Sequence, residues 1–297
     1  MSSPLAGVVI VTLAINLPGP VAASRLAMLG AKVIKVEPPQ GDPLQGAAPS
    51  WYSELVTGQE VIRLDLKDPA GRSGFLARLA QADVLLTAMR PSAFARLRLL
   101  ADLQFHNTAL VEIVGHDGPL AEQPGHDLTY QAAHGTLLPP ALPLVPVADL
   151  LGAERAVSAT FAALRQRDHG ARNVHERVSL DDAAHSAAAG VRHGLTSPGS
   201  VLGGATPSYG IYETADGYIA VAALEPHFVN RLSALVGRTR DELARGFAAR
   251  TTEYWTALGL AHDLPLAAVA RPGVGTPDAR QGVAAATGRH TSHFTGH

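Results

Sequence analysis

The first forty residues contain the pattern that most restricts how this chain can fold. An apolar run from Val8 to Leu13 predicts a buried strand, and the segment "AKVIKVE", residues 31–37, predicts a second strand. Between them, Pro20 suits the start of a helix and Gly30 suits its C-terminal cap. A strand, a short helix and another strand in this order predict a parallel βαβ unit.

The turn between the first strand and the helix reads Leu-Pro-Gly-Pro, residues 17–20. A dinucleotide-binding turn needs several glycines, so that backbone N–H groups can approach a pyrophosphate. This turn has one glycine between two prolines, and proline has no N–H to donate. We therefore expect a closely packed strand-to-helix turn and no dinucleotide site.

The alternation of strands and helices continues to about residue 120. Further strands are expected over residues 60–66, 83–89 and 109–115, and further helices over residues 68–82 and 91–99. This order is typical of a doubly wound parallel sheet. The fold class is therefore expected to be α/β, with a parallel sheet in this part of the chain.

The remainder of the chain is richer in helices. A long helix is expected over residues 148–167, a strand and a helix over 175–195, and a hairpin over 209–224 that leads into further helices. We expect a large domain over residues 1–185, a smaller α+β domain over 186–270 and a poorly ordered tail over 271–297.

Composition excludes several functional classes. Hydrophobic residues make up 46% of the 297 residues and charged residues 17%, which indicates a globular chain. The formal net charge of −2 offers no general attraction to nucleic acid or to an anionic membrane. The absence of cysteine excludes disulfides and thiolate metal sites. No apolar stretch has the length of a membrane helix, and we expect a cytoplasmic protein.

Several ionisable residues stand where loops are expected to enter helices. His126 and Asp127 precede one helix, Asp149 begins the long helix, and Glu225 follows the hairpin. Taken alone, Asp127 and Asp149 suit helix caps and His126 suits a polar loop. If two such helix N-termini meet, they form an acid–base or nucleophilic site, and the spacing leaves both interpretations open.

The sequence lacks the motifs of two other kinds of site, a metal site and a serine hydrolase site. The chain has thirteen histidines, three of them within the final "RHTSHFTGH", but no His-Glu-x-x-His segment, and we expect no metal site. It also lacks the Gly-x-Ser-x-Gly segment of many serine hydrolases.

Four segments occur in an order that resembles the family III CoA-transferases, a superfamily that also contains the α-methylacyl-CoA racemases. They are "GPVAASRLAMLGAKVIKVEPPQGDP", "RLDLKDPAGRSGFLARLAQADVLLTAMRPSAFARL", "GHDGPLAEQPGHDLTYQAAHG" and "GGATPSYGIYETADGYIAVAALEPHF". The resemblance extends from about Leu5 to Val236. It implies a Rossmann-like domain that holds coenzyme A, and an interlocked homodimer with its active site between the large and small domains. A CoA thioester and a carboxylic acid are then the substrates, with no tightly bound cofactor.

The resemblance also implies roles for three catalytic candidates. In the transferases, the aspartate that matches Asp149 attacks an acyl-CoA and forms an acyl-aspartyl anhydride. In the racemases, the residues that match His126 and Asp149 face opposite sides of the α-carbon, and one removes the proton that the other returns. Glu225 matches a racemase-type glutamate that forms a hydrogen bond with the histidine.

Three basic residues match positions near CoA. Arg90, in "MRPS", matches an arginine that contacts phosphate, and Lys35 and Lys67 are further candidates. Some positions depart from the family pattern: Ala148 precedes Asp149, Gln45 stands where a basic residue is usual, and the C-terminal part is short. CoA transfer, 2-methylacyl-CoA racemisation and a divergent non-catalytic member therefore remain open.

Overall fold

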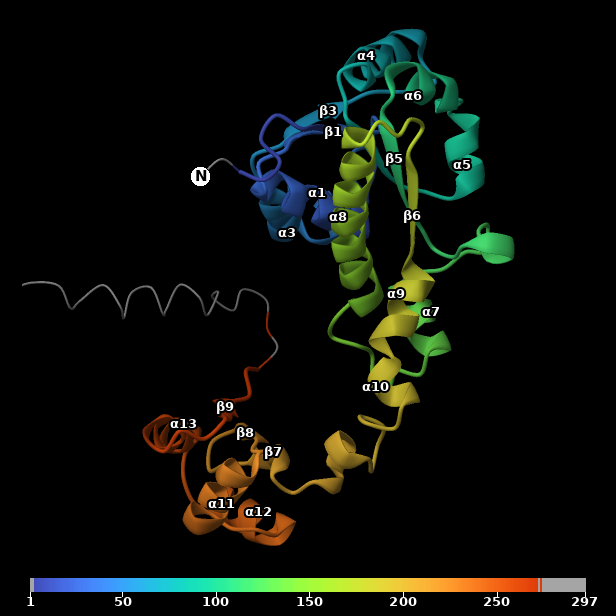
Figure 1. Ribbon diagram of the computed structural model, residues 1–297. Helices are drawn as coiled ribbons and strands as arrows, with labels where there is room; N and C mark the ends of the chain where they lie inside the picture. The colour runs from blue at the N-terminus through green and yellow to red at the C-terminus, as the bar shows by residue number, and fades with distance from the viewer. Residues whose placement is uncertain (1–2, 272, 274–297) are drawn as a thin grey trace, which may run out of the picture. The chain divides into compact units, whose positions relative to one another are not determined.

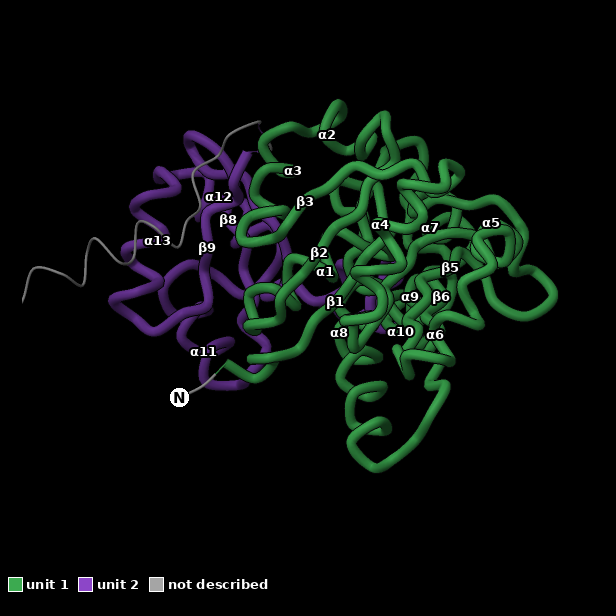
Figure 2. The backbone as a smooth tube through the Cα atoms, turned by 90° about the horizontal axis from the view of Figure 1, so that it is seen from above, with its two compact units in different colours: residues 1–193 green, residues 194–297 purple. Residues whose placement is uncertain are grey.

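The computed structural model describes residues 3–271 and 273, and its contacts divide the chain into two compact units. Unit 1 is residues 1–193 and unit 2 is residues 194–297 (Figure 2). The division expected after residue 185 falls inside helix α9 (Leu180–Ala187). Apart from residues 271 and 273, the tail expected over 271–297 lies outside the described residues.

Unit 1 is built on a parallel sheet of six strands in the order β3-β2-β1-β4-β5-β6. This order confirms the predicted α/β, Rossmann-like large domain. Because the order reverses between β1 and β4, a crevice is expected at the carboxyl ends of these two strands. The strands are β1 (Val9–Thr12), β2 (Lys32–Glu37), β3 (Glu60–Arg63), β4 (Val84–Ala88), β5 (Ala109–Val114) and β6 (His175–Ser179).

Helices cover both faces of this sheet (Figure 1). Helices α1 (Pro18–Met28) and α8 (Val147–Asp168) pack on one face. On the other face lie α4 (Pro69–Leu79), α5 (Pro91–Arg96) and α6 (Leu100–His106). β5 is consequently buried at all six positions. The other helices of unit 1 are α2 (Pro43–Ala47), α3 (Pro49–Leu55), α7 (Asp127–Ala133), α9 and α10 (Ala189–Arg192), with a 3₁₀ turn at Gly118–Leu120.

The Leu-Pro-Gly-Pro turn packs closely against the first strand, as predicted. A Cβ atom placed on Gly19 would lie 2.1 Å from the Cβ of Ala14 and 3.4 Å from that of Ala88. Asn16 supplies the left-handed backbone of the turn, with a φ of 69°. Helix α1 begins at Pro18, two residues before the predicted start at Pro20.

Unit 2 is a small α+β unit with an antiparallel sheet in the order β7-β8-β9. The predicted hairpin is formed by β7 (Tyr209–Glu213) and β8 (Tyr218–Ala222), and the short β9 (Leu266–Ala268) adds a third strand. Helices α11 (Pro226–Leu235), α12 (Arg240–Ala248) and α13 (Thr252–Ala261) follow, and a π-helical segment at Val201–Ala205 precedes the hairpin. Phe247 and Trp255 pack edge to face in the core of this unit. None of the described helices has the length and apolarity needed to cross a membrane.

Candidate active site

A cavity of about 250 Å³ lies at the carboxyl ends of β1, β4 and β5, next to the point where the strand order reverses. Three predicted site residues, Asp149, His126 and Arg90, line it together with Tyr130. They come from segments far apart in the sequence: the loop after β4, the start of α7 and the first turn of α8. Unit 1 therefore brings a carboxyl group, an imidazole and a guanidinium to one cavity.

Asp149 is the third residue of α8, and its carboxyl group faces unfavourable surroundings for a negative charge. Pro146 is the N-cap residue, so the interpretation of Asp149 as a cap is wrong. Within the described residues, its carboxyl group has no hydrogen-bond partner. Burial, together with the negative charge of Asp127, raises the pKa of Asp149 to about 7. A large fraction of Asp149 is therefore protonated at neutral pH.

Asp127 caps α8 from the neighbouring helix. The backbone N–H groups of Ala148 and Asp149 donate to Asp127 Oδ1 at 2.8 and 3.2 Å. The Gln131 amide donates to Asp127 Oδ2 at 2.6 Å and to the Val145 carbonyl at 3.1 Å. Asp127 thus joins α7 to the start of α8 and uses N–H groups that could have stabilised an Asp149 anion.

His126 precedes the first residue of α7 and is exposed. Its backbone is fixed by Thr129, whose hydroxyl accepts from the His126 N–H at 3.0 Å and donates to the His126 carbonyl at 2.7 Å. His126 lines the cavity with Asp149. The two groups that sequence analysis paired thus share one cavity.

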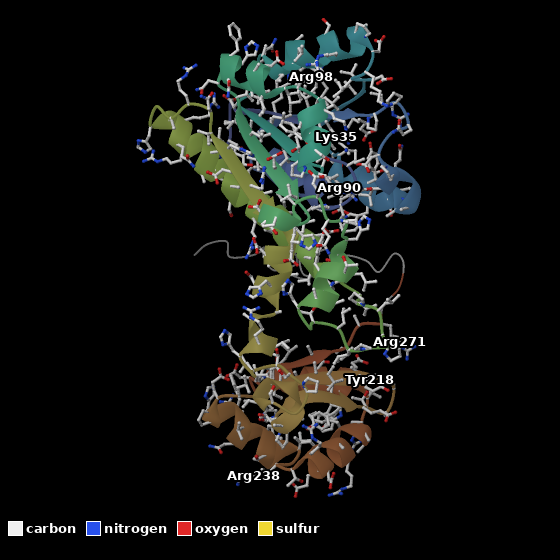
Figure 3. All side chains as sticks on the ribbon, turned by 90° about the vertical axis from the view of Figure 1, so that its right-hand side faces the viewer. Lys35, Arg90, Arg98, Tyr218, Arg238 and Arg271 are labelled. Atoms are coloured by element: carbon white, nitrogen blue, oxygen red, sulfur yellow. The ribbon has the colours of Figure 1, made fainter. Side chains whose placement is uncertain are left out.

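Arg90 is the N-cap residue of α5, two residues after the end of β4, and is exposed. No carboxylate among the described residues forms an ion pair with it, so its guanidinium is available to an anion at the cavity. Figure 3 labels Arg90 and Lys35 in unit 1.

Lys35 and Lys67 differ in what they can contact. Lys35 lies in β2 and is fully buried, and its ammonium donates to Asp42 Oδ2 at 2.7 Å and to the Ala14 carbonyl at 2.9 Å. Its charge is therefore held inside the unit. Lys67 is exposed and lines a second, largely apolar cavity of about 360 Å³, which shares Ile15 and Met89 with the first.

Glu225 belongs to unit 2, where it is the exposed N-cap residue of α11. It is not among the groups that unit 1 assembles. Within residues 3–271, no group of three or more histidine, aspartate or glutamate side chains is arranged to hold a metal ion.

Neither the role of Tyr130 at the cavity nor the position of Asp127 was predicted from the sequence. Tyr130 follows His126 by four residues, one helical turn, and this spacing could have placed both on one helix face. The hydrogen bonds of Asp127 could not be predicted from local spacing, because its two N–H donors lie about twenty residues away on another helix.

Comparison with known proteins shows what this chain is similar to. A sequence model described as CoA-transferase family III matches residues 5–287. The chain is 32% identical to an acetyl-CoA:oxalate CoA-transferase of Acetobacter aceti, over 60% of this chain and 51% of that protein. It is 30% identical to an α-methylacyl-CoA racemase of Homo sapiens, over 80% of this chain and 66% of that protein. The chain thus spans between half and two thirds of the length of these relatives.

Solved structures share the fold. A CAIB/BAIF family protein from Brucella suis superposes with a TM-score of 0.77 at 24% identity, over 96% of this chain and 86% of that chain. A protein from Mycobacterium tuberculosis superposes with the same TM-score of 0.77 at 23% identity, over 96% and 88% of the two chains.

Proposed function

This chain belongs to CoA-transferase family III, and we propose that it moves coenzyme A from an acyl-CoA thioester to a carboxylic acid. The observation that carries this proposal is the Asp149 carboxyl group, which lines the cavity and has no hydrogen-bond partner among the described residues. A carboxylate that makes no hydrogen bond to neighbouring protein groups can act as a nucleophile. Arg90 on the same cavity supplies the positive charge that an anionic substrate needs.

The first half of the reaction forms an anhydride on Asp149. The ionised carboxylate attacks the thioester carbonyl carbon, and the C–S bond breaks to give CoA thiolate and an acyl-aspartyl anhydride. The thiolate then attacks the aspartyl carbonyl carbon of this anhydride. The donor leaves as its carboxylate, and Asp149 becomes a CoA thioester.

The second half reverses these steps with the acceptor. The acceptor carboxylate attacks the aspartyl thioester, which releases CoA thiolate and forms a new anhydride. The thiolate attacks the acceptor's acyl carbon, and the Asp149 carboxylate is regenerated. No proton is gained or lost overall, so the cycle needs only that Asp149 begins ionised.

The two adjoining cavities suit the two ends of a CoA thioester. We propose that the thioester reaches Asp149 in the first cavity while the nucleotide end lies over the second, largely apolar one. Arg90 and Lys67 would then contact phosphate groups from either side. Lys35 acts indirectly: it holds Asp42, which accepts from the Asn16 N–H at 2.9 Å and so fixes the turn beside the cavity.

One observation favours racemisation of a 2-methylacyl-CoA as a second candidate. His126 and Asp149 come from different helices and line the same cavity, as a pair of bases on opposite sides of an α-carbon must. One of them would remove the α-proton and the other would return a proton from the opposite face. Glu225, which belongs to unit 2, is the residue that the resemblance pairs with the histidine in this second candidate.

An isotope experiment separates these candidates. The protein is incubated with a panel of acyl-CoA thioesters in D₂O, with and without an acceptor carboxylate, and followed by NMR and mass spectrometry. CoA transfer predicts a new acyl-CoA only when the acceptor is present, whereas racemisation predicts α-deuterium without it. Asp149→Asn should abolish both reactions, and His126→Ala only the second.

A matched control is offered by Asp241, which also lies in the first turn of a helix but is exposed and belongs to unit 2. Asp241→Asn should retain the wild-type rate. If the wild-type protein neither binds CoA nor changes any thioester, the proposal is wrong and the chain is a non-catalytic family member.

A further inference from the structure

Tyr130 is a buried polar residue of the cavity that the proposed reaction has not used. It lies on α7, only 2% of its surface is exposed, and it lines the cavity with Asp149 and Arg90. Within the described residues its hydroxyl has no hydrogen-bond partner. Two other buried tyrosines do have one: Tyr52 donates to Glu37 at 2.7 Å, and Tyr212 donates to the Pro207 carbonyl. The ring is buried, but the hydroxyl oxygen is not fully enclosed by protein atoms, so it can bond a molecule that occupies the cavity.

The tyrosine ring is held in one place by its neighbours. A Cβ atom on Gly115 would lie 2.4 Å from the Tyr130 hydroxyl oxygen, and one on Gly125 would lie 2.5 to 2.7 Å from the ring and hydroxyl. The His116 ring packs edge-on, with its centroid 5.2 Å from that of Tyr130. Both glycines line the cavity as well. The hydroxyl is therefore positioned before any ligand arrives, which is what transition-state stabilisation requires.

The charges around the hydroxyl keep it a donor. Burial, and then the negative charges of Asp149 and Asp181, raise the pKa of Tyr130 to about 12, while Arg90 acts in the opposite direction. The hydroxyl thus keeps its proton over the whole working pH range. An oxygen that gains negative charge in the cavity is its natural acceptor.

We propose that the Tyr130 hydroxyl donates a hydrogen bond to the thioester carbonyl oxygen of the bound acyl-CoA, an assignment that rests on the function proposed above. As the Asp149 carboxylate bonds to the carbonyl carbon, the electron pair of the C=O π bond moves onto that oxygen. The hydrogen bond strengthens as this charge develops, and it weakens again when the C=O bond re-forms and the thiolate departs. The proton stays on Tyr130 throughout.

Tyr130→Phe tests this role, because it keeps the ring between the two glycines and removes the hydroxyl alone. Loss of one such donor lowers kcat by about 10²- to 10³-fold, and we expect KM for the acyl-CoA to stay within a few fold of wild type. The melting temperature should remain unchanged or rise, since no protein hydrogen bond is lost. Tyr212→Phe is the matched control: it loses a protein hydrogen bond, so its melting temperature should fall while kcat stays unchanged.

Two further measurements distinguish a catalytic role of the Tyr130 hydroxyl from a purely structural one. Gly115→Ala should displace the hydroxyl and lower kcat in the same way, even if Tyr130→Phe fails to fold. The second measurement is the infrared spectrum of a ¹³C-carbonyl thioester bound to Asp149→Asn and to the double variant Asp149→Asn with Tyr130→Phe. The C=O stretching frequency should be lower in the single variant, which keeps the tyrosine hydroxyl.

The outcomes separate this inference from the proposed function. A wild-type protein without acyl-CoA chemistry overturns both. A wild-type protein that turns over acyl-CoA while Tyr130→Phe keeps its kcat, or leaves the carbonyl frequency unmoved, overturns only the role of Tyr130.

Discussion

Asp149 shows, at the scale of the residue, how neighbours decide what a carboxyl group can do. Burial and the charge of Asp127 raise the pKa of Asp149 to about 7, although it lies in the first turn of a helix. The N–H groups that would favour its anion are bonded to Asp127 instead. Because the proposed nucleophile is the ionised form, its activity should follow this pKa.

The pH dependence of kcat/KM tests this assignment. For the wild-type protein we expect kcat/KM to rise as pH increases through about 7 and then to level off, because deprotonation creates the nucleophile. Asp127→Asn removes a negative charge that opposes this ionisation, so the midpoint should fall by roughly one pH unit or less. The asparagine keeps an oxygen that can accept from the N–H groups of α8.

Two outcomes would contradict this account of Asp149. One is a midpoint that Asp127→Asn leaves unmoved, and the other is a rate that falls as pH rises through 7. Asp241→Asn, which changes a carboxylate outside the cavity, should leave the midpoint of the wild-type profile in place.

At the scale of the element, the Leu-Pro-Gly-Pro turn at the start of α1 allows close packing, as its sequence predicts. Gly19 lets the first turn of α1 approach Ala14, where any side chain would collide. This approach places Asn16 and Pro18 at the edge of the cavity. The turn therefore shapes the site without offering the N–H groups of a dinucleotide-binding loop.

Gly19→Ala measures what this close approach contributes. The added methyl group must displace backbone or neighbouring side chains, and overpacking of this kind costs about 1–3 kcal/mol in the free energy of unfolding. Gly46→Ala in α2 makes the same change where nothing lies within 4 Å, and it should be neutral or slightly stabilising. Urea denaturation of both variants gives the comparison, and equal stabilities would refute the packing argument.

The same scale shows which elements could be predicted from the sequence. The strands and helices of the βαβ pattern were found because their apolar periodicity is local. Helix α6 was missed because it is seven residues long and its N-cap, Leu99, makes no side-chain cap bond. Strand β9 was missed because its three residues are defined only by pairing with β8.

Lys35 illustrates a limit of local patterns within a correctly predicted strand. Residues 31–37 look alternating, which suggests that their polar positions face a ligand or solvent. Helices on both faces of the sheet bury β2 from Val33 to Glu37, so Lys35 points into the protein and pairs with Asp42. Which face is covered depends on helices that come later in the chain, and no local pattern reports it.

At the scale of the whole molecule, the loop before α8 exposes an unusual amount of apolar surface. Leu138, Leu142 and Leu144 are 68%, 74% and 80% exposed. Neighbouring exposed leucines of this kind mark surfaces that bind another protein. The resemblance to proteins that form interlocked homodimers leads us to propose a second copy of this chain as the partner.

Sedimentation or light scattering over a range of concentrations tests this assembly. The wild-type protein should have twice the mass of one chain, and a variant that combines Leu142→Asp with Leu144→Asp should shift towards the monomer, because burying carboxylates at an interface is costly. A wild-type monomer at every concentration, or a double variant with an unchanged mass, would refute the proposed dimer surface.

The proposed reaction depends on a covalent bond between the substrate and Asp149. We would incubate the protein with an active acyl-CoA, add hydroxylamine, digest the protein and locate any aspartyl hydroxamate by mass spectrometry. An anhydride or thioester on Asp149 predicts a hydroxamate at Asp149 that needs the acyl-CoA and is absent from Asp149→Asn. Turnover of the acyl-CoA without any label on Asp149 would contradict the proposed mechanism.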